Sequence, residues 1–187
     1  TGAWTATVKV GGANFSKRIR IETIKPNRLK INLRVPQETV LRGEALNAPM
    51  HVEWLQGAKA HNMRYEIEGT FISTKTSFSK YKDYVFDDPS KTFSNESSSL
   101  ITGTTDDEGN TEVTANFNVG NSAPGMLVGN LVTRVFEESG DFSINSSRVV
   151  YSPYRKFAGI LAPSQKGDHL DTGRNYAYKV ASVNYDG

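Results

Sequence analysis

The sequence predicts an all-β protein, an antiparallel β-sandwich of the immunoglobulin or fibronectin type. Apolar residues alternate with polar ones in many short segments, and turns rich in Gly, Asn and Asp separate these segments. No window keeps apolar residues three and four positions apart over the length of a helix. Because successive side chains of a strand point to opposite faces, each segment is expected to turn one face to a core and the other to water.

The N-terminal residues 1–24 predict a hairpin. Residues 5–10 and 18–22 alternate, and the intervening Gly11-Gly12 can take the positive φ values that tight hairpin turns require. The clearest strand is residues 29–35, where Leu, Ile, Leu and Val alternate with Lys, Asn and Arg. This segment predicts a strand with one buried face.

The apolar run of residues 52–55 stops abruptly at Gly57. We predict that Trp54 is a core anchor near the end of a strand, and that Gly57 turns the chain in a hairpin before it returns over residues 63–71. Turns are also predicted at residues 106–110 and 137–141, which combine acidic side chains with a glycine. The other strands are predicted at residues 64–68, 112–117, 127–136, 141–146, 147–151 and 175–180.

Residues 73–101 lose the alternating pattern and are rich in Ser, Lys and Tyr. The segment is too long for an ordinary loop, so it is either an insertion or a pair of poorly patterned edge strands. Its lysines alternate with aromatic residues, which suggests either a basic aromatic surface for sugars or single strands, or an insertion whose aromatics pack on the sandwich. We favour packing. These residues are Lys75, Phe78, Lys80, Tyr81, Lys82, Tyr84, Lys91 and Phe93.

Composition excludes several classes of function. With 22 basic and 20 acidic side chains the formal charge is +2, far short of a nucleic-acid-binding surface, so no nucleic-acid partner is expected. The chain has no cysteine and therefore no disulfide, thiol nucleophile or thioester. No run approaches the roughly 18 apolar residues of a membrane span. Since the chain starts without a signal region, we expect a segment of a longer precursor.

Three phrases occur in an order that resembles a domain of the bacterial alpha-macroglobulins. They are a P-x-R-L phrase at residues 26–29, a W-L-x-G-x-x-A phrase at residues 54–60, and a D-x-x-G turn at residues 106–109. Residues 78–88 fit the same order between the second and third phrases. The resemblance implies a closing hairpin of a preceding domain at 1–25, a complete macroglobulin-like sandwich at 26–150 with its insertion near 73–101, and opening strands of a following domain at 151–187.

The resemblance further implies a structural scaffold segment of a large endopeptidase inhibitor that traps proteases, periplasmic or on the cell surface. Its partners would be neighbouring macroglobulin-like domains and, through the parent chain, target proteases. The family's Cys-Gly-Glu-Gln thioester cannot lie in a chain without cysteine. The alternative function is a cell-surface adhesion or carbohydrate-binding module, which the aromatics around Tyr81 and Tyr84 suggest.

No catalytic, cofactor-binding or metal-ligating residue is predicted, and no enzyme activity is expected. His51, His61 and His169 lack partners at metal-ligand spacing. Residues 106–108 lack the alternating ligands of a calcium loop, so turn chemistry is the better interpretation. The pair at residues 87–88 and the serines at 97–99 are interpreted as loops, because no histidine phrase or nucleophile elbow accompanies them.

The terminal segments lead to a prediction about assembly. If residues 1–24 and 151–187 are halves of two different sandwiches, their apolar faces need cover. They are expected to pair with one another in a second lobe, or with another copy of the chain in a dimer.

Overall fold

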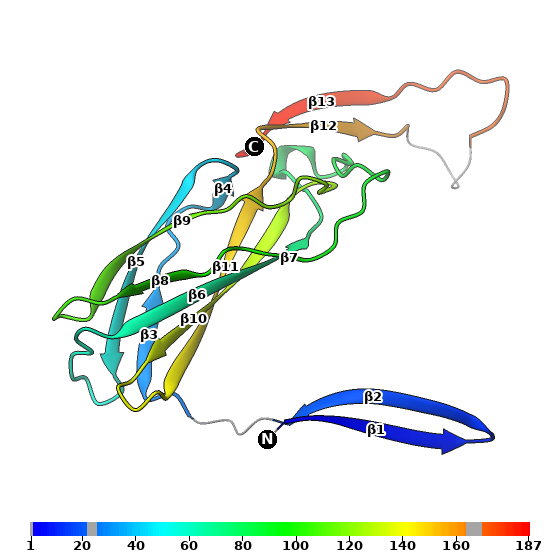
Figure 1. Ribbon diagram of the computed structural model, residues 1–187. Coiled ribbons are helices and arrows are strands. Elements are labelled where there is room, and N and C mark those ends of the chain that lie inside the picture. Colours follow the sequence, from blue (N-terminus) through cyan, green and yellow to red (C-terminus); the bar gives the residue numbers. More distant parts are fainter. Residues whose placement is uncertain (1, 22–25, 164–169) are drawn as a thin grey trace.

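The computed structural model describes residues 2–21, 26–163 and 170–187 (Figure 1). It confirms the all-β prediction, since the only helical element of this part of the chain is the 3-10 turn η1 (Ser79–Tyr81). The strands are β1 (Gly2–Val10), β2 (Ala13–Ile21), β3 (Leu29–Leu33), β4 (Thr39–Leu41), β5 (Ala45–Trp54), β6 (Arg64–Ser73), β7 (Glu96–Ser97), β8 (Ile101–Thr104), β9 (Asn110–Asn116), β10 (Leu127–Phe136), β11 (Phe142–Ser152), β12 (Lys156–Leu161) and β13 (Lys179–Asn184).

A sandwich of two sheets forms the body of the molecule. The three-stranded sheet has the order β3-β5-β9, and the six-stranded sheet has the order β4-β11-β10-β6-β7, with β8 also paired to β6. The pairs are antiparallel except for β4, which runs parallel to β11. The sandwich prediction is confirmed, but the three-residue strand β4 is too short for its alternation to be recognised in the sequence.

The core lies between these two sheets. Alternate residues of β3 and β5 are buried and their neighbours are exposed, as the sequence predicts. At the centre, the Phe71 ring contacts Phe117 and Tyr151 edge-on, with centroid distances of 5.0 and 5.3 Å. The Tyr151 hydroxyl donates a hydrogen bond to the Phe117 carbonyl oxygen at 3.0 Å, so its burial leaves no unpaired polar group.

The prediction that Gly57 turns a hairpin is wrong in its topology. The local geometry is a tight turn, because Gly57 has φ +87° and its N–H donates to the Trp54 carbonyl oxygen at 2.8 Å. However, β5 pairs with β3 and β9, whereas β6 pairs with β10 in the other sheet. Residues 55–63 therefore cross between the two layers. A tight turn reverses the chain locally, but long-range contacts decide which strands pair.

The other predicted turns are present. Gly140, with φ +84°, lies in a true hairpin between β10 and β11. Gly109, with φ +82°, lies in the turn that leads from β8 in one sheet to β9 in the other. Gly11 and Gly12 form the two-residue loop between β1 and β2, where Val10 pairs with Ala13. Residues 22–24 of the predicted N-terminal hairpin lie outside the described residues.

Several strand boundaries differ from the prediction. A single strand, β11 (Phe142–Ser152), forms where two strands were predicted at residues 141–146 and 147–151. The last strand was predicted at residues 175–180, but the structure has it at Lys179–Asn184 (β13). In its register with β12, Lys179 pairs with Leu161 and Asn184 pairs with Lys156. Within residues 73–101 both interpretations hold in part, since irregular chain up to residue 95 is followed by the short edge strand β7.

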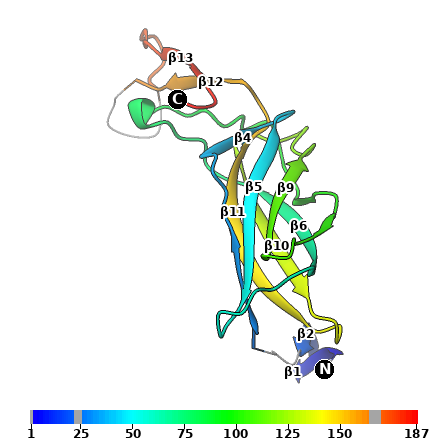
Figure 2. The same ribbon diagram turned by 90° about the vertical axis from the view of Figure 1, so that its left-hand side faces the viewer.

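Two hairpins lie beyond opposite ends of the sandwich (Figure 1), and each is a separate two-stranded sheet. The expected pairing of the terminal segments with one another is therefore not found among the described strands. A second apolar cluster lies where the irregular segment meets β12 and β13. Figure 2 shows the backbone of this region from the side. No helix in the described ranges has the length and apolar character needed to cross a membrane.

Candidate functional site

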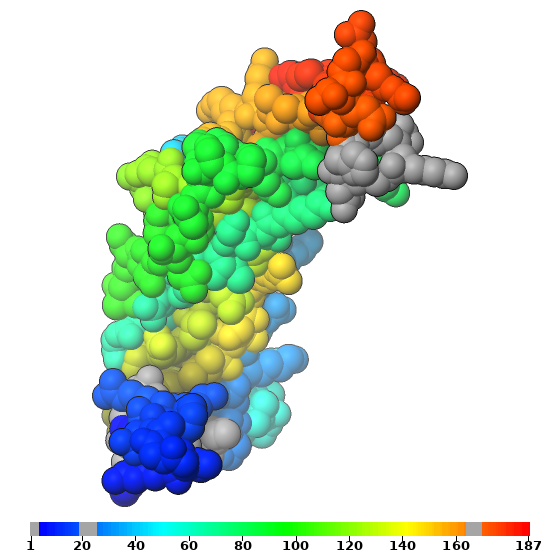
Figure 3. Space-filling view, turned by 90° about the vertical axis from the view of Figure 1, so that its right-hand side faces the viewer, coloured from blue at the N-terminus to red at the C-terminus, as the bar shows by residue number. Residues whose placement is uncertain are grey.

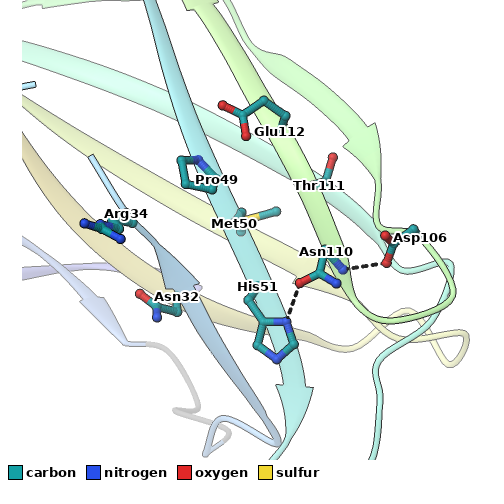
Figure 4. A pocket seen from close by; sticks show the side chains of 9 residues that line it. All are labelled: Asn32, Arg34, Pro49, Met50, His51, Asp106, Asn110, Thr111 and Glu112. Atoms are coloured by element: carbon teal, nitrogen blue, oxygen red, sulfur yellow. Dashed lines mark hydrogen bonds between the residues drawn. The ribbon is translucent and has the colours of Figure 1, made fainter. Parts of the chain in front are cut away.

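A polar groove lies on the outer face of the three-stranded sheet (Figure 4). Its volume is about 460 Å³. The outward-facing residues of β3, β5 and β9 form most of it. Successive side chains of a strand point to opposite faces, so every second residue is buried in the core and the residues between them face outward. The lining residues are Asn32, Arg34, Pro49, Met50, His51, Asp106, Asn110, Thr111 and Glu112.

Hydrogen bonds fix the side chains at one end of this groove. His51 on β5 lies opposite Asn110 on β9, and His51 Nδ1 lies 2.8 Å from Asn110 Oδ1. Asp106 Oδ1 accepts from the backbone N–H groups of Asn110 at 2.7 Å and Glu108 at 2.9 Å. The Asp106 carboxylate is therefore held by its own turn.

An ion pair continues the polar face next to the groove. Lys30 on β3 lies directly opposite Glu53 on β5, and Lys30 Nζ donates to Glu53 Oε1 at 2.8 Å. This hydrogen bond, together with the positive charge of Lys30, lowers the pKa of Glu53 below its usual value of 4.5. The same contact raises the pKa of Lys30 above 10.5.

The groove combines polar side chains with apolar surface that includes Pro49 and Met50. Thr111 is the only hydroxyl that lines it, and no residue of the lining pairs a nucleophile with a base. Nowhere in the described ranges do three or more His, Asp or Glu side chains gather as a metal site. The face offers hydrogen-bond donors and acceptors from three strands.

The predicted histidines do not converge. His51 lines the groove, whereas His61 is exposed in a second hollow at the end of the sandwich, where Arg28 lies 5.3 Å above the ring of Trp54. His169 lies outside the described residues. Trp54 itself is half-buried against the core, so it closes the end of the sandwich and does not fill its centre.

The acidic candidates have separate structural partners. Asn62 donates to Asp107 Oδ1 at 2.9 Å, and Glu108 forms an ion pair with Lys59. Both oxygens of Asp87 accept from the backbone N–H of Thr76, at 3.1 and 3.2 Å.

The last of the candidate loop residues are held by local hydrogen bonds. Asp88 accepts from the hydroxyl and the backbone N–H of Ser90, which lowers its pKa. Among the serines at 97–99, Ser98 Oγ accepts from the Gly69 N–H at 3.0 Å, which ties the segment to β6. These contacts are those of loops and turns.

The aromatics of the irregular segment are covered, as the packing interpretation predicts. Most of them pack on the C-terminal hairpin and not on the sandwich core. Phe93 packs on the sandwich core. Phe78 and Phe86 are buried, and Tyr81 and Tyr84 are half-buried, in the cluster with Phe157 of β12 and Val183 of β13. The sequence reasoning missed these hairpin residues, because no local pattern indicates that two segments about 70 residues apart in the chain will meet.

The four lysines of the same segment differ in their contacts. Lys75, Lys80 and Lys82 are exposed. Lys91 binds the hydroxyl of Tyr154 at 3.0 Å, a contact that raises its pKa above 10.5.

Comparisons with known proteins identify the family. A family model described as the bacterial alpha-2-macroglobulin MG5 domain matches residues 27–147. No curated protein matches. Among solved structures, alpha-2-macroglobulin of E. coli in its native conformation aligns with 100% of this chain at a TM-score of 0.61 and 17% identity. Salmonella alpha-2-macroglobulin reacted with methylamine aligns over 100% at a TM-score of 0.60 and 18% identity.

The trypsin-activated form from E. coli aligns with 87% of the chain, at a TM-score of 0.58 and 17% identity. The chain spans 11% to 13% of the length of these three structures. Identities this low show a shared fold, and the family model adds a match over most of the sandwich. The predicted resemblance is confirmed, while the boundaries at 25/26 and 150/151 remain predictions. The chain belongs to the bacterial alpha-2-macroglobulin MG5 domain family.

Proposed function

We propose that this chain is a non-catalytic scaffold segment of a larger bacterial alpha-2-macroglobulin-type endopeptidase inhibitor, which traps proteases in the periplasm or at the cell surface. The supporting observation is the family match at residues 27–147, which coincides with the two-sheet sandwich. Its partners are neighbouring macroglobulin-like domains and, through the parent, proteases.

The N-terminal hairpin fits this role. An isolated two-stranded sheet is marginally stable in water, because it has no second layer to cover its apolar face. Trp4 and Phe15 of the N-terminal hairpin are 60% and 63% exposed. Neighbouring domains of the parent would supply the missing layer, and the polar groove over β3, β5 and β9 would contact such a domain through hydrogen bonds.

Protease protection by the parent protein tests the proposal. The parent is mixed with trypsin, and hydrolysis is followed with a large protein substrate and with a small chromogenic peptide. A trap is expected to block the large substrate and to leave the peptide accessible. Leu131→Asp, which places a charge in the sandwich core, is expected to abolish protection, whereas exposed Thr102→Lys retains it.

The isolated chain of 187 residues provides the complementary measurement. As a scaffold it should neither hydrolyse casein nor inhibit trypsin on its own. Stoichiometric inhibition by this chain alone, or protection that survives Leu131→Asp, contradicts the scaffold role.

The carbohydrate-binding alternative has less support. Tyr81 and Tyr84 stand edge-to-face, with ring centroids 5.3 Å apart and planes at 87°, and both are half-buried. They therefore present no pair of parallel rings to a sugar. Glycan binding that is lost in a Tyr81→Ala, Tyr84→Ala double variant would revive this alternative.

A further inference from the structure

Residues 76–88, here called the clamp segment, reach from the sandwich to the C-terminal hairpin. The segment follows β6 and contains η1, which lies close to β12 and β13 in Figure 2. In the space-filling view of Figure 3 its green surface lies against the orange surface of β12. The clamp segment thus connects two sheets that share no strand.

The base of the clamp segment is fastened to the sandwich. The Asp87 carboxylate accepts from the Thr76 N–H and so closes the segment into a loop. Thr76 is buried, and its hydroxyl accepts from the Met126 N–H at 2.8 Å. The Asp88 N–H donates to the Pro124 carbonyl oxygen at 2.8 Å. These bonds hold the loop on the residues that lead into β10.

The tip of the clamp segment is bonded to the hairpin. The N–H of Val85 donates to the carbonyl oxygen of Ile160, and the N–H of Ile160 donates to that of Val85, both at 2.9 Å. Through this antiparallel bridge, Val85 pairs with the edge of β12 that does not face β13. The clamp segment therefore supplies backbone partners as well as side-chain cover.

An aromatic contact completes the interface. The Phe78 ring meets Phe86 at 4.8 Å and Phe157 at 5.7 Å between centroids. Phe86 lies directly over Gly159 of β12, where a Cβ atom would come within 2.3 Å of the ring. Glycine at this position lets the ring touch the strand backbone. The opposite face of β12 is exposed.

The short connection between the two sheets is also held. The Tyr154 hydroxyl donates to the Ala123 carbonyl oxygen at 2.7 Å, and the Ser152 hydroxyl donates to the Tyr154 carbonyl oxygen at 2.7 Å. Lys91 contacts the Tyr154 ring at 4.9 Å from its centroid. The residues that could act as a hinge are therefore tied to the sandwich.

We propose that the clamp segment fixes the orientation of the β12–β13 hairpin, and of whatever structure the hairpin belongs to, relative to the sandwich. This role goes beyond the proposed scaffold function and does not depend on protease trapping. The competing explanation is that the connection at residues 153–155 sets the orientation alone and the clamp segment only covers apolar surface.

Spin-label distances in the full 187-residue chain test the proposal. The chain has no cysteine, so Thr102→Cys on β8 and Ser182→Cys on β13, both exposed, give one defined label pair. The starting protein is expected to give one narrow distance distribution. Phe86→Ala is expected to broaden it, and to accelerate amide exchange in β12 and β13 by about 100-fold through loss of the buried ring. Exchange in β6 and β10 should not change.

A double-variant cycle isolates the contact. Gly159→Ala alone is expected to release the hairpin, because its new methyl group meets the Phe86 ring. In the Phe86→Ala background the same change should add nothing. Ala158→Val, on the exposed face of β12, is the matched control and should leave exchange unaltered.

Two results would contradict the proposed role of the clamp segment. Unchanged distances and exchange in Phe86→Ala would mean that the connection alone holds the hairpin. An equal acceleration in β6 and β10 would mean that the clamp segment is part of the sandwich core and does not link two bodies. Val85→Pro, which removes the N–H donor to Ile160 and also fixes the backbone φ of residue 85, gives an independent variant with the same expected outcome.

Discussion

At the scale of single residues, two glycines share a backbone conformation but differ in their surroundings. Gly109 has φ +82° and Gly140 has φ +84°. A Cβ on Gly109 would lie 2.2 Å from the Val52 carbonyl oxygen, whereas Gly140 has no atom within 4 Å of that position. Val52 also donates its N–H to the Gly109 carbonyl oxygen at 2.8 Å. The first glycine is thus required by close approach as well as by conformation.

The two glycines predict different costs of substitution. Gly140→Ala is expected to lower the free energy of unfolding by about 1 to 2 kcal/mol, the cost of a left-handed alanine. Gly109→Ala is expected to cost about 3 kcal/mol or more, because the methyl group also disrupts the bond to β5. Urea unfolding followed by circular dichroism measures both. Equal costs would show that the contact with Val52 contributes nothing.

Replacing either of two buried threonines by valine is expected to change the unfolding free energy in opposite directions. Thr105 Oγ1 donates to the Ala60 carbonyl oxygen and accepts from the Met63 N–H, whereas Thr133 Oγ1 has no hydrogen-bond partner in the described part of the chain. Thr133→Val is expected to raise the unfolding free energy by about 1 kcal/mol, and Thr105→Val to lower it by about 2 kcal/mol. Thermal unfolding of both variants checks the signs; a stability loss in Thr133→Val contradicts the first.

At the scale of elements, the pair Lys30–Glu53 joins β3 to β5 and makes their pairing sensitive to pH. The folded protein lowers the pKa of Glu53, so its contribution is complete above the unfolded value of 4.5 and is lost as the pH falls through the lower folded value. The pair is exposed, so the effect is expected to be small.

The acid dependence of stability tests this pair. Glu53→Gln should lose less unfolding free energy than the starting protein between about pH 6 and about pH 3, since it has no carboxylate to protonate. Glu44→Gln, at an exposed turn position, serves as the control and should follow the starting protein. Parallel pH profiles for Glu53→Gln and the starting protein would exclude a contribution of the pair.

The strands of the sandwich could be predicted because their signal is local. Leu29, Ile31 and Leu33 alternate with polar residues whether or not their partners are known, and the strand predicted at residues 127–136 has the observed bounds of β10. The assignment of strands to sheets could not be predicted. Gly57 and Gly109 each end a tight turn, yet both turns lead to the opposite sheet, since pairing depends on residues far away in the chain.

The same limit applies to the candidate site. The alternation of residues 29–35 predicts that Asn32 and Arg34 face water. Nothing local indicates that β3, β5 and β9 lie side by side and form one groove. The sequence predicts that Phe78 packs on the sandwich. The cover, Phe157 and Val183, became evident only in three dimensions.

At the scale of the whole molecule, the N-terminal hairpin presents one apolar face to solvent. Trp4, Val8, Val10 and Phe15 are all more than half exposed, and the register places Val8 opposite Phe15. The other face carries Thr5, opposite Arg18, and Ser16, opposite Thr7. A contiguous apolar face of this kind favours association.

The isolated chain is therefore expected to self-associate as its concentration rises, as the predicted dimer requires. Trp4→Lys with Phe15→Lys should shift it to monomer, because charges replace the apolar contacts. Thr5→Lys with Ser16→Lys adds the same charge to the opposite face and should have little effect. Sedimentation velocity measures all three; a monomer at every concentration, or an equal response of both double variants, contradicts this association.

The pairing of β4 with β11 has a consequence for biosynthesis. Residues 39–41 meet residues 150–152 in register, and the backbone N–H of Arg42 donates to the Ser152 carbonyl oxygen at 2.9 Å. Ribosomes add about 5 to 20 residues per second, so several seconds separate the synthesis of the two strands. The sandwich cannot close during that interval, so the edges of its earlier strands stay unpaired until β11 has been synthesised.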